Sequence, residues 1–110
     1  MTLRIVYPVT DLAQAKALYR ALLGVDPSID QPYYVGFDVN GEHVGLDPNG
    51  HAHGMTGPIS YWPVEDIDKS LQQLLEAGAQ EHQPIRNVGG GKIAAVKDAD
   101  GNVTGLIQAL

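Results

Sequence analysis

The sequence predicts an α+β fold of two tandem βαβββ modules, which would form a curved mixed sheet with the helices outside and a concave cleft inside. Residues 9–12 (Val-Thr-Asp-Leu) recur as residues 64–67 (Val-Glu-Asp-Ile), half a chain length later and again after a short apolar run. Residues 40–46 and 100–106 form a second matching pair in the same order. The 13 glycines and 7 prolines among 110 residues indicate many short elements joined by turns.

The repeat also predicts the domain organisation. A chain of 110 residues has the size of a single domain. Within it, module one is predicted at about residues 1–48 and module two at about residues 58–110. The segment at about residues 49–57 is rich in Gly and His and is predicted to be the linker between the modules.

Module one begins with a short apolar strand at residues 3–9, followed by a helix at residues 11–23. Thr10 or Asp11 would cap the start of this helix, and Gly24 stands where a left-handed cap is expected at its end. Apolar side chains recur at helical spacing at Leu12, Ala15, Tyr19 and Leu22. We therefore expect one face of the helix to cover the sheet.

The rest of module one is predicted to be a three-stranded meander. A weak strand is expected near residues 26–31, and residues 33–39 alternate clearly between apolar and polar side chains. Asn40 and Gly41 then predict a two-residue type I′ hairpin turn into the next strand.

Module two repeats this order. A strand at residues 59–64 precedes a helix at residues 66–77, which Glu65 or Asp66 would cap and Gly78 would end. The apolar face of the helix comprises Ile67, Leu71, Leu74 and Leu75. Strands are then expected at residues 80–87, 92–97 and 103–109, with a turn at residues 98–102.

Strand alternation predicts which side chains line the cleft. A two-residue turn pairs Val39 with Glu42, so that Val35 and Phe37 face the helix as core. Trp62 is predicted to pack against the second helix, and Ala94 to face the cleft. The candidate ligand-binding residues on the cleft side are Arg4, Tyr34, Asp38, His43, Tyr61 and Lys92. Glycines at positions 36, 45 and 105 would leave space beside them.

Structural roles remain open for several of these side chains. Arg4 could pair with Asp38 or Asp47 across the sheet, and His43 could make a structural hydrogen bond to Asp38. Both cleft tyrosines could be packed core. The sequence leaves open the role of the two histidines in the linker, at positions 51 and 53.

Composition excludes several classes of function. Without cysteine, the chain can hold no disulfide, zinc-thiolate site or iron–sulfur cluster and cannot use thiol catalysis. The net charge of −6 provides no basic face for nucleic acid. No run approaches the roughly 18 apolar residues of a membrane span. No secretory signal pattern is seen at the N-terminus, so a cytoplasmic protein without nucleic-acid or membrane partners is expected.

The strand-to-helix junctions, together with Leu18, Tyr19 and the turn at residues 98–102 (Asp-Ala-Asp-Gly-Asn), resemble the vicinal oxygen chelate superfamily, also called the glyoxalase/bleomycin resistance/dioxygenase superfamily. The resemblance implies that four side chains hold a divalent metal in the enzymes of this superfamily. Two stand seven residues before the junction aspartates, and two stand four residues after the hairpin glycines. The matching positions here are Arg4, Ile59, Gly45 and Gly105. None has a side chain suited to metal ligation.

The resemblance therefore implies a member without metal ligands or cofactor, in which lactoylglutathione lyase and dioxygenase activities are not expected. It implies a metal-independent protein that binds a small organic ligand, planar or aromatic, as in antibiotic or natural-product sequestration. Short chains of this family commonly pair, which implies a homodimer. Two alternatives remain. One is a metal-free enzyme that uses His43 as acid or base with Asp38, and the other is a degenerate module that acts through protein contacts. The sequence names neither the ligand nor a reaction.

Overall fold

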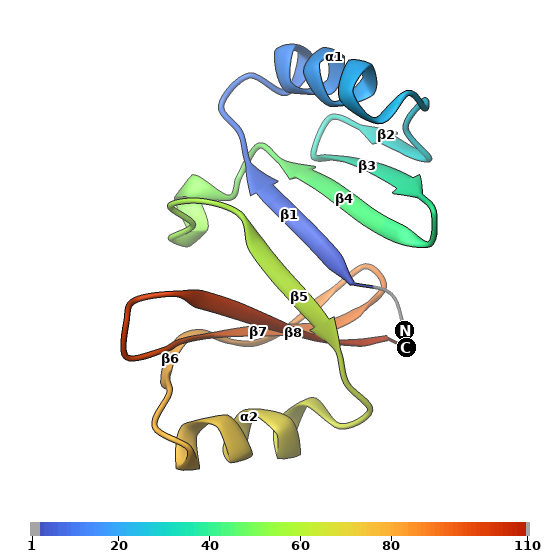
Figure 1. Cartoon of the computed structure of the whole chain (residues 1–110). Helices are drawn as coiled ribbons and strands as arrows, with labels where there is room; N and C mark the ends of the chain where they lie inside the picture. Colours follow the sequence, from blue (N-terminus) through green and yellow to red (C-terminus); the bar gives the residue numbers. More distant parts are fainter. Residues whose placement is uncertain (1–2, 110) are drawn as a thin grey trace. The chain divides into compact units, whose positions relative to one another are not determined.

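The computed structural model describes residues 3–109, so Met1, Thr2 and Leu110, which the predicted module bounds include, lie outside it. The elements in chain order are β1 (Arg4–Pro8), α1 (Leu12–Leu23), β2 (Ile29–Gln31), β3 (Tyr34–Val39), β4 (Glu42–Asp47), the 3₁₀ helix η1 (His51–His53), β5 (Ile59–Pro63), α2 (Ile67–Glu76), β6 (Gln80–Val88), β7 (Gly91–Lys97) and β8 (Val103–Ala109) (Figure 1). This βαβββ order, present twice, confirms the predicted α+β class. No helix within the described range is long and apolar enough to cross a membrane.

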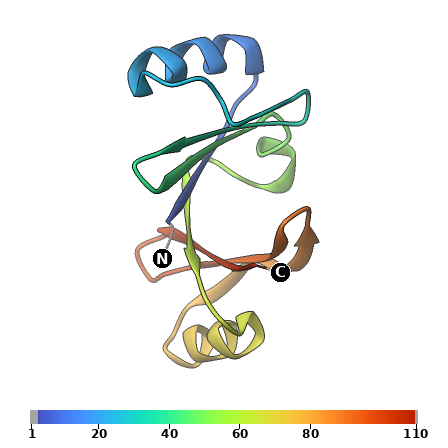
Figure 2. The same ribbon diagram turned by 90° about the vertical axis from the view of Figure 1, so that its right-hand side faces the viewer.

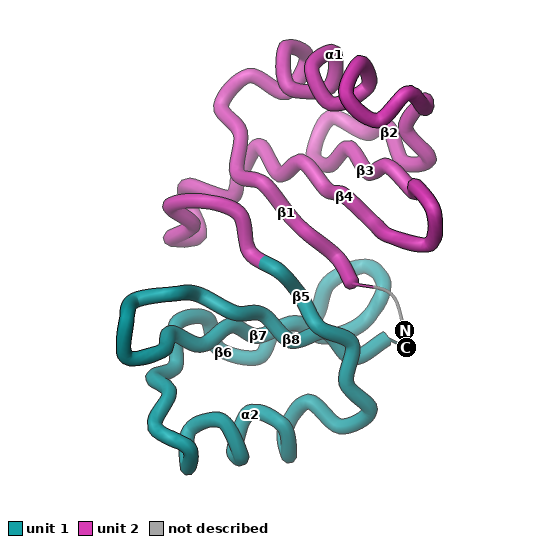
Figure 3. The backbone as a smooth tube through the Cα atoms, in the orientation of Figure 1, with its two compact units in different colours: residues 1, 60–110 teal, residues 2–59 magenta. Residues whose placement is uncertain are grey.

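The chain divides into two compact units between Ile59 and Ser60. The residues up to Ile59, magenta in Figure 3, are called here the first unit, and the residues from Ser60 on, teal in Figure 3, the second unit. The segment predicted to be the linker contains η1 and belongs to the first unit. Its Met55 is buried, with its sulfur next to Gly50. The linker is therefore a folded part of the first unit.

The first unit is a four-stranded sheet in the order β2-β3-β4-β1, covered on one face by α1 (Figure 2). β1 runs parallel to β4, whereas β2, β3 and β4 form an antiparallel meander. Both turn residues have positive φ, 51° at Asn40 and 82° at Gly41, as a type I′ turn requires. Its core is formed by Val35, Phe37 and Leu46 against the apolar face of α1, so the predicted pairing and core face are confirmed.

Local capping explains where α1 begins and ends. The Asp11 carboxylate accepts a hydrogen bond from the backbone N–H of Gln14 at 3.0 Å, which satisfies one of the unpaired donors of the first turn. At the other end, Gly24 has a φ of 71° and donates its N–H to the Arg20 carbonyl. Asp66 caps α2 in the same way as Asp11 caps α1.

The second unit is a four-stranded sheet in the order β5-β8-β7-β6, with β5 parallel to β8. Its helix α2 covers one face, where Ile67 and Leu71 pack against strand residues Ala94, Val96 and Leu106. The Gln108 side-chain oxygen also accepts a hydrogen bond from the backbone N–H of Ile67, at 2.8 Å. Side chains of the sheet thus hold the start of α2.

Two predictions for the second unit are wrong. Trp62 is not core, because 46% of it is exposed. The helix α2 packs on β6, β7 and β8, so it does not cover β5, the strand that carries Trp62. Ala94 lies in the core beneath α2 and not on the opposite face, because it pairs with Leu106 rather than with Gly105.

Candidate functional site

Four side chains of the first unit form a continuous chain of hydrogen bonds, called here the relay. The Ser28 hydroxyl donates to one oxygen of the Asp38 carboxylate. The other carboxylate oxygen lies 3.0 Å from Nδ1 of His43. Nε2 of His43 lies 2.7 Å from the hydroxyl oxygen of Tyr34. The relay therefore joins an exposed carboxylate to a phenol through one imidazole.

The β3–β4 hairpin builds the relay. Asp38 and His43 are opposite each other in the register, on the face of the sheet away from the α1 core. Tyr34, at the start of β3, extends over Gly36 and Gly45 on the same face toward His43, and its ring is almost parallel to that of His43, with 6.0 Å between the ring centroids. The turn at Asn40 and Gly41 determines this register and therefore also places Asp38 opposite His43.

Two glycines make room for these rings. A Cβ atom on Gly45 would lie 1.9 Å from the Tyr34 hydroxyl oxygen, and one on Gly36 would lie 2.7 Å from Cε1 of His43. The predicted space over these glycines is therefore filled by side chains of the protein itself, which holds Tyr34 and His43 close to the sheet.

The protonation pattern of the relay follows from Asp38. The Ser28 hydrogen bond and then the His43 hydrogen bond hold the pKa of the Asp38 carboxyl below its usual value, and the positive charge of Arg4 acts in the same direction. An ionised carboxylate only accepts hydrogen bonds, so Nδ1 of His43 must donate to it. In the neutral imidazole, Nε2 is then an acceptor, and the Tyr34 O–H is the donor.

The exposure of the relay residues differs sharply. His43 is 4% exposed, whereas 61% of the Asp38 side chain is exposed and Tyr34 is half-buried. Arg4 is opposite His43 in the β1–β4 register and is half-buried. Four of the candidate residues therefore lie on one face of one unit, as predicted, and ligand binding by them stays a prediction.

In the second unit, Tyr61 is buried and its hydroxyl donates to the side-chain oxygen of Gln83 at 3.2 Å. Its ring covers Gly105, where a Cβ atom would lie 2.3 Å from Cδ1 of the ring. Tyr61 and Gly105 are paired in the β5–β8 register, on the face away from α2.

The predicted position of Lys92 is wrong. Lys92 is opposite Gln108 in the β7–β8 register, and the Gln108 side chain reaches the start of α2. Lys92 therefore shares the α2 face of the sheet and does not join Tyr61. Because the turn before β8 has five residues, the alternation of apolar and polar residues does not determine which side chains of β7 lie on which face of the sheet. A two-residue turn would have determined this.

Sequence reasoning missed Ser28 and Gln83. The backbone N–H of Ser28 donates to the Gly36 carbonyl at 2.8 Å, which brings the Ser28 hydroxyl to Asp38. The only signal was a serine just before β2, a strand of three exposed residues without alternation. Gln83 lies beside an irregularity in the β6–β7 pairing, which the sequence does not reveal.

The positions that correspond to the metal ligands of related enzymes do not fit a metal. In the first unit they are Arg4 and Gly45, and the Tyr34 hydroxyl fills the space where a side chain at position 45 would begin. In the second βαβββ repeat they are Ile59 and Gly105, and the Tyr61 ring fills the space where a side chain at position 105 would begin. Among residues 3–109, no three His, Asp or Glu side chains group together as a metal site would require.

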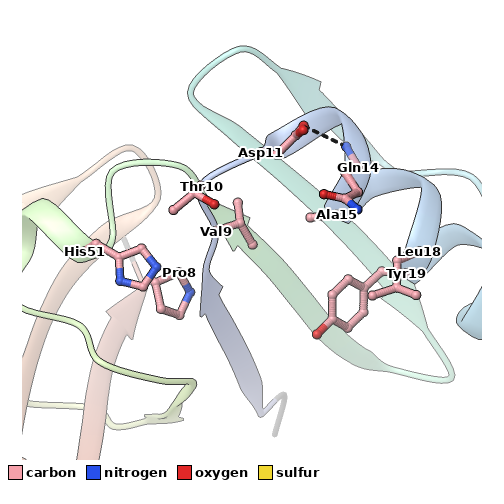
Figure 4. A pocket seen from close by; sticks show the side chains of 9 residues that line it. All are labelled: Pro8, Val9, Thr10, Asp11, Gln14, Ala15, Leu18, Tyr19 and His51. Carbon is pink, nitrogen blue, oxygen red and sulfur yellow. Dashed lines mark hydrogen bonds between the residues drawn. The ribbon is translucent and has the colours of Figure 1, made fainter.

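An open pocket of about 410 Å³ lies elsewhere on the first unit, between the start of α1 and η1 (Figure 4). Pro8, Leu18 and His51 line it, together with Asp11 and Tyr19. The Asp11 carboxylate is already the cap of α1, and burial beside Tyr7 raises the pKa of the Tyr19 hydroxyl. No relay residue lines this pocket, so it is separate from the candidate site.

Comparison with known proteins identifies the family. The family model Glyoxalase/Bleomycin resistance protein/Dioxygenase superfamily matches residues 3–106. No curated protein matches the sequence significantly. A structure described as an NAD-dependent benzaldehyde dehydrogenase from Legionella pneumophila has a TM-score of 0.82 and 18% identity over 98% of this chain and 99% of that chain.

Two further structures are similar to this chain. A glyoxalase/bleomycin resistance protein/dioxygenase superfamily member from Vibrio splendidus 12B01 has a TM-score of 0.75 and 18% identity, over 98% of this chain and 97% of that chain. Methylmalonyl-CoA epimerase from Mycobacterium tuberculosis has a TM-score of 0.63 and 19% identity, over 99% and 86%. At these identities the likeness concerns the fold alone. The chain belongs to the Glyoxalase/Bleomycin resistance protein/Dioxygenase superfamily.

Proposed function

We propose that this chain binds a small organic molecule without a metal ion and acts by capturing it. One observation carries the proposal. The spaces over Gly45 and Gly105, where the family's metal ligands would begin, hold Tyr34 and Tyr61, whose hydroxyls are hydrogen-bonded to His43 and Gln83. Phenol groups in ordered positions suit recognition of an organic ligand.

The side chains on the face of the first unit away from α1 favour a planar or partly aromatic ligand, such as an antibiotic or another natural product. Stacking on the Tyr34 ring would contribute on the order of 1 kcal/mol beyond area burial. A hydrogen bond from the Arg4 guanidinium to an oxygen of the ligand would contribute about 1.5–3 kcal/mol where water is excluded. The net charge of −6 would also attract a cationic drug.

Capture is tested with metal-free bleomycin as the probe. Calorimetric titration should give saturable, stoichiometric binding without added metal. Mass spectrometry should then recover the drug unchanged, and protection of its target should rise in proportion to the protein added. Conversion of the drug, or protection by a small fraction of a molar equivalent of protein, would identify an enzyme instead.

The binding face is tested with two matched arginine variants. Arg4→Ala should weaken binding at least about tenfold. Arg20→Ala removes the same charge from α1, where Arg20 is 62% exposed and pairs with Asp26, and should bind like wild type. Equal effects of both substitutions would place the ligand elsewhere. Native mass spectrometry of the protein purified from its own cells would capture any other ligand class.

A further inference from the structure

We propose that α1 is the docking surface for a second copy of this chain, and that two α1 helices pack antiparallel about a two-fold axis. Leu22 of each copy then enters the pocket beside the start of α1 in the other copy. The inference goes beyond the proposed function, because the relay lies on the face of its sheet away from α1. The homodimer that the family resemblance implies has no stated interface, and this surface provides one.

The first observation is the composition of α1. All of its residues except Gln14, Lys16 and Arg20 are Ala, Leu or Tyr. A helix that is apolar on nearly every side is normally buried. No residue of α1 is buried, however, since only the inner face of the helix packs on the sheet. In the part of the chain that the structure describes, the outer face of α1 is therefore an apolar surface without a cover.

The helix of the second unit shows the contrast. In α2, Asp, Lys, Ser, Gln and Glu alternate with the apolar residues, and its two buried side chains, Ile67 and Leu71, pack on the sheet. On α1, by comparison, Leu18 is 63% and Leu22 is 72% exposed. Removing these two leucines from water favours association, and exposed apolar patches of this kind mark protein contacts.

The second observation is that the exposed leucines adjoin a hollow. Gln14, Leu18 and Leu22 recur at intervals of four residues, so they form one stripe along the exposed side of α1. Gln14 and Leu18 also line the open pocket, together with Pro8 and His51 (Figure 4). A stripe with a protruding side chain at one end and a hollow at the other complements a second copy of itself across a two-fold axis.

The third observation is the charge at the two ends of this stripe. Asp11 lines the pocket, and among residues 3–109 only one oxygen of its carboxylate has a partner, the Gln14 N–H. Arg20, in the last turn of α1, pairs with Asp26 through Nε at 2.7 Å, which leaves its terminal NH₂ groups as donors.

In an antiparallel pair, the Asp11 carboxylate of each copy meets the Arg20 guanidinium of the other. Such exposed ion pairs add little affinity, but two reciprocal pairs determine the direction and the register of the helices. The chain thus carries both halves of the contact, so a second copy is the occupant that these observations favour.

Substitution of the leucines tests the apolar part of the surface. Wild type should have twice the chain mass in light scattering at micromolar concentration. The double variant Leu18→Gln, Leu22→Gln retains good helix formers and should dimerise at least about a hundredfold more weakly. Leu75→Gln is the matched control, because Leu75 is 40% exposed on α2, and it should remain a dimer. Circular dichroism and urea unfolding verify the fold of each variant.

Exchange of charges tests the antiparallel register. Arg20→Glu or Asp11→Lys places like charges together at both ends of a homodimer, so each variant should dimerise at least about tenfold more weakly than wild type. A mixture of the two variants restores both attractive pairs, and native mass spectrometry should show mostly mixed dimers. Asp66→Lys removes the corresponding cap of α2 and should leave the wild-type dimer intact.

The inference is overturned by a monomeric wild type, by a leucine double variant that dimerises as tightly as wild type, or by mixed dimers no more abundant than homodimers. A dimer that Trp62→Gln disrupts, and the leucine substitutions do not, would place the interface at the exposed Trp62 of the second unit. The substituted residues of α1 lie away from the relay face, so the bleomycin titration tests ligand capture independently.

Discussion

The hydroxyl oxygen of Tyr34 lies where a side chain at position 45 would begin, since a Cβ atom on Gly45 would be only 1.9 Å from it. Gly45 is therefore packed against Tyr34, whose hydroxyl is in turn hydrogen-bonded to His43. A change at any one of them must displace the others.

Gly45→Ala should destabilise the protein by about 1–3 kcal/mol, because the methyl group overpacks a filled site and pushes Tyr34 away from His43. Urea unfolding measures the change. Tyr34→Ala removes the obstacle, so adding Gly45→Ala to that variant should cost much less, which a double-mutant cycle reports as a coupling energy. Gly57→Ala is the control, because nothing lies near its Cβ position. Additive effects of the two substitutions would contradict the packing.

Phe37→Ala should cost about 3–5 kcal/mol of unfolding free energy, because Phe37 is 0% exposed and its removal leaves a cavity under α1. Arg4→Ala, on the opposite face, should leave the unfolding free energy nearly unchanged while it weakens ligand binding. Chemical denaturation of both variants shows whether only the core face of the sheet contributes to the free energy of unfolding. A large loss of stability in Arg4→Ala would mean that this face is structural.

Asp38→Asn should lower stability in a pH-dependent way. Its hydrogen bonds to Ser28 and His43 hold the pKa of the folded Asp38 carboxyl below its ordinary value of 3.8. The carboxylate therefore stabilises the fold above pH 3.8, and this contribution is lost as the pH falls through the lower folded value. The difference between wild type and Asp38→Asn in urea unfolding should shrink below pH 3.8. If the difference in unfolding free energy stays constant with pH, the contribution of Asp38 to stability does not depend on its charge.

Protein purified without a metal-affinity tag should contain no stoichiometric Ni, Zn, Fe or Mn. The reason is that Arg4, Gly45, Ile59 and Gly105 occupy the positions of the family's metal ligands. Elemental analysis measures the metal content, and chelation distinguishes tight from loose binding. About one metal ion per chain, retained through mild chelation, would refute the prediction.

The chain should form a symmetric dimer. A domain of 110 residues buries only about 65% of its unfolded surface by itself, and short chains of this family commonly pair. Light scattering at micromolar concentration should give twice the chain mass of 11.8 kDa. A monomer mass under these conditions would exclude the pairing.

The sequence by itself determined the element order and the facing of the first hairpin. Asn40 and Gly41 permit one tight turn, and a two-residue turn leaves only one register for its strands. Alternation then placed Val35 and Phe37 in the core and Asp38 and His43 on the opposite face. These are local constraints, so a pattern of neighbouring residues contains them.

Only the tertiary structure decided the remaining contacts. The contact between Ser28 and Asp38 depends on how β2, three exposed residues long, pairs with β3. The position of Lys92 depends on a five-residue turn that permits either facing of β7, and the exposure of Trp62 depends on how far α2 extends across its sheet. The hydrogen bond between Tyr34 and His43 forms because Gly36 and Gly45, paired on neighbouring strands, leave one shared space that these two side chains fill. Such packing depends on three-dimensional volume, which the spacing of residues along a chain does not encode.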